Sequence, residues 1–255
     1  MDKKENLLMI NFFENEKGVK AYFTTREGGV SVGEFQSLNM GFNTSDENVT
    51  RNRDIVIKSL GADVCEIVPT QVHKTDIVLI DKVEDKRVFI GEYDALVTKK
   101  KNILLTTCHA DCLAVYLYDR ENKVIGLAHA GWKGTLGEIA VKTFLKMRDE
   151  LGASAETTVA AISPGISKCC FEVGAEVYEA FKEKFSYIDE ASVKKENGKY
   201  NLDLKKLNLR QLKECGISHV EISEYCTSCR TDMFFSHRKE QGKTGRMCAG
   251  IFMFD

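Results

Sequence analysis

The sequence places a group of polar residues between two apolar runs, in the stretch LLTTCHADCLAVYLYD. This group contains Cys108, His109, Asp111 and Cys112. Burying such side chains costs free energy unless each of them finds a partner. The residue types fit three alternatives: a metal site, a thiol nucleophile with its base, or a structural kink whose polar groups are all satisfied.

His129 ends a second apolar run, KVIGLAHA, and lies 17 positions after Cys112. The two side chains could meet if their strands are neighbours, as sequential strands often are. A cysteine with two histidines from separate segments would form a zinc site with one open position, which is typical of catalytic zinc. Two alternatives remain open: Cys112 as a nucleophile with His129 as its base, and a buried unreactive thiol. His73, in QVHKTDI, is a lone histidine in a turn and by itself a weak candidate ligand.

Three glycine-containing stretches could bind anions. In AHAGWKGT, backbone N–H groups at a helix start and the side chain of Lys133 would favour phosphate or carboxylate. Solvated basic loops and ordinary strand–helix turns look the same in sequence. The other basic candidates, in TTREGGVS and FFSHRKEQGKTGRM, are Arg26, His237, Arg238, Lys239, Lys243 and Arg246. Asn39, in SLNMG, offers an amide that can recognise a base or a sugar hydroxyl.

A CxxC pair, Cys226 and Cys229, lies in CTSC near the end of the chain. It could belong to a zinc site or to a redox site. A zinc site needs two further ligands, for which Cys248 and His237 are candidates in number only.

Composition excludes several classes. The chain has 255 residues, a formal net charge of −2 and 43% hydrophobic residues, so nothing indicates a nucleic-acid or membrane partner. No apolar run reaches the roughly 18 residues of a membrane span. The start, MDKKENLLMINFF, is not a convincing signal peptide, so we expect a cytoplasmic protein. Nine cysteines without such a signal favour metal binding, catalysis or burial over a disulfide framework.

The elements that must position these residues are strands and helices without a strict βαβ alternation. Apolar runs predict strands at DALVT, NILLTTC, LAVYLYD, KVIGLAHA, TTVAAIS and RMCAGIFMF. Helical spacing predicts helices that begin at Asn48 or Thr50 and end at Gly61, that run from a Thr135 cap to Leu151, and that cover GAEVYEAFKEKF and DLKKLNLRQLKECG. We therefore expect one domain over residues 1–255, of mixed α/β or α+β class, and no GxGxxG or P-loop motif occurs.

Nine of these stretches, taken in order, resemble the laccase-domain family, also called YfiH/YlmD-like or multicopper polyphenol oxidase family proteins. They are TTREGGVS, SLNMG, QVHKTD, DALVT, HADC, AHAGWKGT, ISPGISKCCFEVGAEV, NLDL and FFSHRKEQGKTGRM. The resemblance runs from about Tyr22 to Phe254. It implies an α/β/β/α layered sandwich, related to a toxin fold with a Cys–His hydrolase pair.

The same resemblance implies a zinc ion bound by His73, Cys112 and His129. It also implies phosphorolysis of adenosine, inosine, guanosine and S-methyl-5′-thioadenosine, together with adenosine deamination. The older laccase label implies copper-dependent phenol oxidation, but five histidines cannot supply a full multicopper set. A metal-independent Cys–His hydrolase and a non-enzymatic binding protein are further alternatives, and the oligomeric state stays open.

For this chemistry the chain offers a candidate for each role. Cys112 would be a metal ligand. Asp111 has two alternative roles: it would carry the proton in deamination, or it would orient a metal ligand. Inorganic phosphate would be held by basic side chains, and Trp132 and Asn39 would contact sugar or base. The full set of candidate substrate-binding residues is Arg26, Asn39, Trp132, Lys133, His237, Arg238 and Arg246. His109 is left outside the zinc triad, as an extra ligand or a neighbour of the site.

Overall fold

The structure is a computed structural model that describes residues 9–83 and 85–255. Most of the start on which the signal-peptide expectation depends therefore lies outside the described residues. Among the described residues no helix is long and apolar enough to span a membrane.

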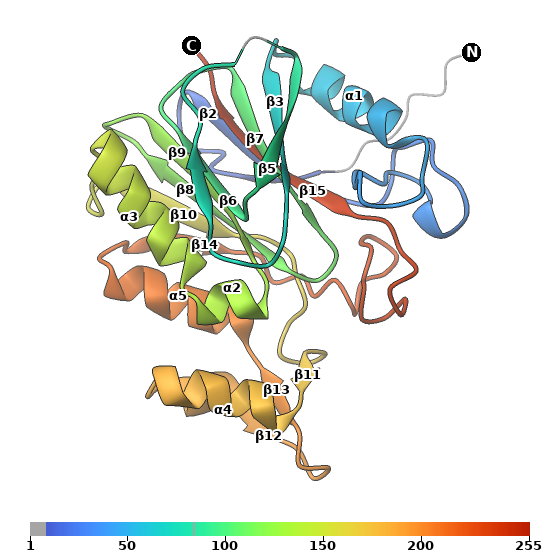
Figure 1. Cartoon of the computed structure of the whole chain (residues 1–255), viewed down its shortest axis with the longest axis vertical. Helices are drawn as coiled ribbons and strands as arrows, with labels where there is room; N and C mark the ends of the chain where they lie inside the picture. Colours follow the sequence, from blue (N-terminus) through green and yellow to red (C-terminus); the bar gives the residue numbers. More distant parts are fainter. Residues whose placement is uncertain (1–8, 84) are drawn as a thin grey trace.

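Two six-stranded mixed sheets form the centre of the molecule (Figure 1). The first sheet has the strand order β1 (Met9–Phe12), β2 (Val19–Thr24), β15 (Met247–Met253), β7 (Ile103–His109), β3 (Cys65–Thr70), β5 (Arg87–Glu92). The second has the order β14 (His219–Ile222), β10 (Thr158–Ile162), β8 (Leu113–Asp119), β9 (Val124–Ala130), β6 (Ala95–Thr98), β4 (Ile77–Leu79). A small third sheet contains β11 (Glu172–Val173), β13 (Tyr200–Leu202) and β12 (Ser192–Lys194).

Helices cover the outer faces of both large sheets (Figure 1). α1 (Val49–Leu60) packs on the first sheet through Val56 and Leu60. α3 (Ile139–Leu151) and α5 (Leu204–Glu214) belong to the core on the outer face of the second sheet. The expected α/β/β/α layering is therefore confirmed. The other helical segments of the described residues are η1 (Gly33–Phe35), α2 (Trp132–Leu136), α4 (Ala175–Lys184) and η2 (Ile188–Ala191).

Strand β8 shows why its sequence is a continuous apolar run. Every residue of this strand is buried. Val115 and Leu117 face the core shared with the helices, whereas Tyr116 and Tyr118 face the core between the sheets. Because side chains alternate along a strand, a strand buried on both faces must be apolar throughout. The central strands were predictable for this reason.

The prediction of one helix from Thr135 to Leu151 is wrong in one respect, because two separate helices, α2 and α3, cover this stretch. α2 ends at Leu136, Gly137 follows, and Glu138, the residue before α3, adopts the left-handed region with φ 58°. A Cβ at Gly137 would lie 2.6 Å from Thr75, so the chain passes too close to its neighbour for a larger residue. Thr135 does not cap α3; it is buried within α2.

Candidate functional site

Three segments bring His73, Cys112 and His129 together. Their ligand atoms all lie within 4.8 Å of one another. Cys112 lies in the turn that joins β7 to β8, and His129 lies on β9. β8 and β9 are paired neighbours, with Ala114 opposite His129. Cys112 and His129 could meet only if these two strands were neighbours. The loop between β3 and β4 supplies His73.

Asp94 organises two of these ligands, although the sequence had not indicated it. Its Oδ1 is 2.8 Å from Nδ1 of His129 and both side chains are buried. The same carboxylate accepts backbone N–H bonds from Val72, His73 and Lys74, at 2.8–3.2 Å. One buried side chain therefore fixes both the ring of His129 and the loop that carries His73.

The backbone around the three ligands is also specialised. His73 has φ 59°, a left-handed conformation that is uncommon for residues other than glycine. Gly131 approaches the ligands closely, since a Cβ there would lie 3.0 Å from Sγ of Cys112 and 3.4 Å from the His73 ring. The glycine of AHAGW is thus required by the close approach of backbone to ligands.

Cys112 and His129 form an ionised pair at neutral pH. Burial acts to raise the pKa of the Cys112 thiol, but the charge of His129 and hydrogen bonds from His129 and His73 lower it to about 6. Burial acts to lower the pKa of His129, but Cys112 and Asp94 raise it to about 9. The sulfur is therefore already a thiolate, the form that binds metals and attacks electrophiles.

His109 supports the site without pointing a free nitrogen at it. Its Nδ1 is 3.1 Å from the Cys112 carbonyl oxygen and its Nε2 is 2.8 Å from the Thr107 hydroxyl. The carbonyl can only accept, so Nδ1 donates and Nε2 accepts from the hydroxyl. Burial and the neighbouring His129 hold the pKa of His109 well below its usual range, so the ring is neutral. Both nitrogens are occupied, and His109 positions the Cys112 backbone.

A cavity of about 290 Å³ opens over the three ligands. Besides the ligands, it is lined by Asn43, Gln71, Cys108, Ala110, His237 and Arg246. Two of the predicted substrate-binding residues, His237 and Arg246, are therefore at the cavity. The side-chain amide of Gln71 is paired with the backbone of Cys108. Its oxygen accepts from the Cys108 N–H at 2.7 Å, and its nitrogen donates to the Cys108 carbonyl oxygen at 2.9 Å.

The carboxylate of Asp111 is surrounded by donors from the loop before β15. Oδ1 accepts from the hydroxyls of Thr227 and Ser236 at 2.7 and 2.8 Å, and Oδ2 accepts from the backbone N–H of Arg238 at 2.7 Å. Asp111 is buried, has φ 84°, and is absent from the residues that line the cavity. This environment favours the second role considered from the sequence, orientation of the neighbouring ligand Cys112.

Arg26 and Asn39 are placed away from the cavity lining. Asn39 is fully buried, and its amide donates to Thr44 and Asp46 while accepting from Gly41 and Arg246 N–H groups. Arg26 pairs with Glu240 at 3.1 Å and donates to the carbonyl oxygens of residues 36 and 231. Both side chains are occupied in holding loops together.

Trp132, Lys133 and Arg238 are also outside the cavity lining. Trp132 packs partly against the core of the second sheet, and the exposed Lys133 has its Nζ 5.6 Å from the Trp132 ring. Arg238 donates to the carbonyl oxygen of Glu172 at 2.9 Å.

The CTSC pair lies in a separate group of cysteines. Cys226 and Cys229 lie with Cys169 and Cys170, so neither Cys248 nor His237, the two candidates for further ligands, belongs to this group. Cys248 is opposite Cys108 in the pairing of β15 with β7, and His237 lines the cavity.

Comparison with known proteins places the chain in a family. The sequence model of the family described as multi-copper polyphenol oxidoreductase laccase matches residues 20–254. A Bacteroides thetaiotaomicron protein named purine nucleoside phosphorylase is 34% identical, over 98% of this chain and 97% of its own length. A protein from an unknown prokaryotic organism, named adenosine deaminase RL5, is 31% identical over 95% of this chain and 97% of its own length. The crystal structure of the Bacillus licheniformis protein YfiH superposes with a TM-score of 0.92 at 33% identity, covering 99% of this chain and 98% of that one.

The match extends over nearly the whole chain in both sequence and structure, which confirms the family suggested by the nine motifs. We conclude that this chain belongs to the multi-copper polyphenol oxidoreductase laccase family, the YfiH/YlmD-like proteins.

Proposed function

We propose that this protein is a zinc-dependent purine nucleoside enzyme. It would phosphorolyse adenosine, inosine, guanosine and S-methyl-5′-thioadenosine to the base and the sugar 1-phosphate, and it would deaminate adenosine. The observation that carries the proposal is the convergence of His73, Cys112 and His129 beside a cavity. Relatives over nearly the full chain length carry the names of both activities.

The three side chains fit a catalytic zinc site. His129 uses Nδ1 on Asp94, which leaves Nε2 as its ligand atom. Metal-binding histidines usually donate their other nitrogen to a carboxylate in this way. The lowered pKa of Cys112 supplies a thiolate ligand, and three protein ligands leave a position for substrate. Zinc bound there would supply Lewis-acid chemistry to the reacting oxygen atoms.

Arg246 and His237 support binding of phosphate. Arg246 lines the cavity, and its Nη1 donates to the backbone oxygens of Thr244 and Gly245, both at 2.8 Å. These bonds orient the guanidinium and use only part of its five N–H donors. The remaining donors suit the forked recognition of phosphate oxygens. His237 lies in the same lining and can donate one further hydrogen bond.

An aromatic hollow beside the cavity supports binding of the base. This hollow, of about 200 Å³, shares Asn43, Gln71 and Cys108 with the metal cavity. Its lining includes Phe42 and Phe89, whose rings meet edge to face at 4.9 Å. Phe89 is 61% exposed, so part of its ring is open to a ligand in the hollow. A purine ring is a suitable partner because it stacks on aromatic faces.

The experiment that tests this proposal separates the products. Zinc-loaded protein is incubated with adenosine in the presence and absence of inorganic phosphate. We expect adenine, hypoxanthine and ribose 1-phosphate only when phosphate is present, and inosine from deamination in both samples. Absence of all these products from protein shown to contain zinc would contradict the proposal.

One observation favours a second candidate, a metal-independent hydrolase that uses Cys112 as nucleophile and His129 as base. Cys112 and His129 have pKa values of about 6 and 9, so they form a thiolate–imidazolium pair without a metal. Such an enzyme would retain activity in the presence of a chelator and lose it on alkylation of Cys112, whereas the zinc enzyme loses activity with the metal.

A further inference from the structure

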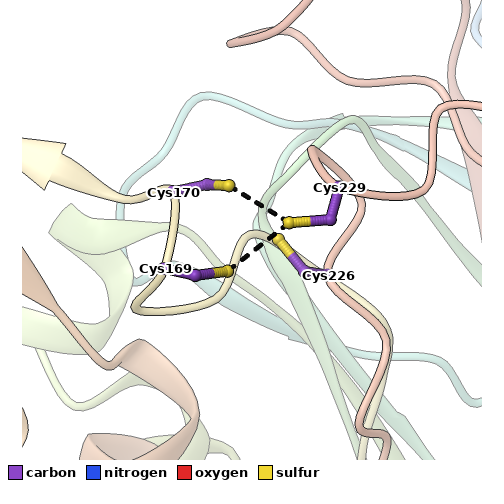
Figure 2. A group of neighbouring side chains, drawn as sticks. All are labelled: Cys169, Cys170, Cys226 and Cys229. Carbon is purple, nitrogen blue, oxygen red and sulfur yellow. Dashed lines mark hydrogen bonds between the residues drawn. The ribbon is translucent and has the colours of Figure 1, made fainter.

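Four cysteines outside the cavity converge on one point (Figure 2). Cys169 and Cys170 come from the segment before β11, and Cys226 and Cys229 come from the segment after β14. The Sγ of Cys229 is 3.6 Å from that of Cys169 and 3.3 Å from that of Cys170. All four sulfur atoms lie within 4.8 Å of one another, and all four are free thiols.

We propose that these four cysteines bind a second, structural zinc ion. A tetrahedral site with Zn–S bonds of about 2.3 Å separates its sulfur atoms by about 3.8 Å. The observed separations of 3.3 and 3.6 Å are close to that value. A multi-iron cluster would need its thiolates spread around several metal atoms, whereas these sulfur atoms surround one position. Four thiolates close the coordination sphere, as in structural sites.

The backbone holds the two cysteine pairs in place. An isolated bridge pairs Gly165 with Cys226, and the N–H of Thr227 donates to the Gly165 oxygen at 3.2 Å. The N–H of Ser167 points at Sγ of Cys226 at 3.4 Å, and the N–H of Cys229 donates to the Cys226 oxygen at 3.2 Å. The segment before Cys169 is therefore held against the CxxC turn by backbone hydrogen bonds and one N–H contact to sulfur.

A positive charge lies close to the cluster. Nζ of Lys205 donates to the carbonyl oxygens of Ser223 and Tyr225 at 2.7 and 2.8 Å, just before Cys226 in the chain. It is within electrostatic reach of Cys226 and Cys169. Zinc with four thiolates carries a net charge of −2, and a buried cation beside it offsets part of that charge.

This second metal would stiffen the loop that supports the nucleoside site. Thr227 lies inside the CxxC turn, and its hydroxyl donates to Asp111 at 2.7 Å. Asp111 precedes the ligand Cys112. Zinc in the cluster would tie the 167–170 segment to the 226–229 segment and so fix Thr227, one of the three donors to Asp111. The inference concerns a separate site: if the triad held no zinc, the unmodified protein should still contain one zinc ion per chain, bound by the four cysteines.

Metal analysis of protein purified under reducing conditions tests the inference. We expect about two zinc ions per chain in the unmodified protein and one in each of the variants Cys169→Ser and Cys229→Ser, which change exposed residues. Cys65→Ser, on β3 of the first sheet, is the matched control and keeps both. Cys112→Ala removes only the zinc of the triad, so the two sites are counted independently.

Cobalt substitution gives a second measurement that leaves the cluster intact. In the Cys112→Ala background, cobalt-loaded protein should show thiolate-to-cobalt charge-transfer absorption from the four cysteines alone. Adding Cys229→Ser should remove most of it. The inference is overturned if the absorption is absent, if iron replaces zinc in the purified protein, or if peptide mapping finds these cysteines joined as disulfides.

Discussion

Asp94 accepts a hydrogen bond from Nδ1 of His129 over 2.8 Å, with both side chains buried. Asp94→Asn keeps the shape, but it removes the charge that raises the basicity of the ring. It also replaces one acceptor oxygen with an amide N–H, so either the His129 ring or the backbone of the loop that carries His73 loses its acceptor. We expect zinc affinity at the triad to fall by about 10–100-fold, with a parallel loss of nucleoside activity. Competition with a chromogenic chelator measures this. Asp76→Asn, an exposed carboxylate two residues after Lys74, is the control and should bind zinc normally.

Alkylation of metal-free protein tests the ionised pair. Because His129 and His73 lower the pKa of Cys112 to about 6 against the effect of burial, thiolate forms as the pH rises through about 6. The alkylation rate of Cys112, followed by peptide mass spectrometry, should therefore rise near pH 6 and level off by about pH 7.5. In His129→Gln the midpoint of the pH dependence of this rate should move to higher pH. A rate in the unmodified protein that still climbs above pH 9, like that of an ordinary thiol, is the contrary outcome.

Asp111→Asn separates orientation from proton transfer. The amide would present N–H groups to a backbone N–H that now donates to a carboxylate oxygen, so we expect a loss of about 1–3 kcal/mol in the free energy of unfolding. The pH profile of kcat should keep its shape. If Asp111 were a proton carrier, the substitution would instead lower kcat by about 10²–10⁴-fold and remove one limb of the pH profile, with stability unchanged.

Phe89→Ala tests the aromatic hollow. Because Phe89 is 61% exposed, its truncation should hardly change stability. Loss of base stacking is worth about 1–3 kcal/mol, so KM for adenosine should rise by roughly tenfold while KM for phosphate stays the same. Phe254→Ala, which truncates another exposed phenylalanine, should leave both constants unchanged. If KM for adenosine were the same in the two variants, the base would not bind in this hollow.

The sequence predicts most of the central architecture. Runs such as LAVYLYD are apolar at every position because the strand is buried on both faces, and such runs are visible without a structure. β5 is not visible in this way, because Arg87–Glu92 lies at a sheet edge with exposed residues. The break between α2 and α3 depends on a close approach to Thr75, a contact that helical periodicity does not contain.

The site was predictable where it depended on ligand chemistry and not where it depended on loop packing. Cys112 and His129 could be paired because their strands follow one another. Asp94 precedes a buried strand and is 35 positions from His129, so only the fold shows that they touch. Arg26 and Asn39 have suitable side chains, but loop contacts occupy them. Cys169 and Cys170 meet the CTSC pair only through the folded loops.

We propose that the His73–Cys112–His129 triad holds the zinc that nucleoside chemistry requires. The most direct test measures zinc content and phosphate-dependent adenine release from adenosine in the same samples of unmodified protein and Cys112→Ala. We expect the variant to lose one zinc ion per chain and the adenine-forming activity together. A variant that lacks this zinc and still releases adenine at the unmodified rate would contradict it.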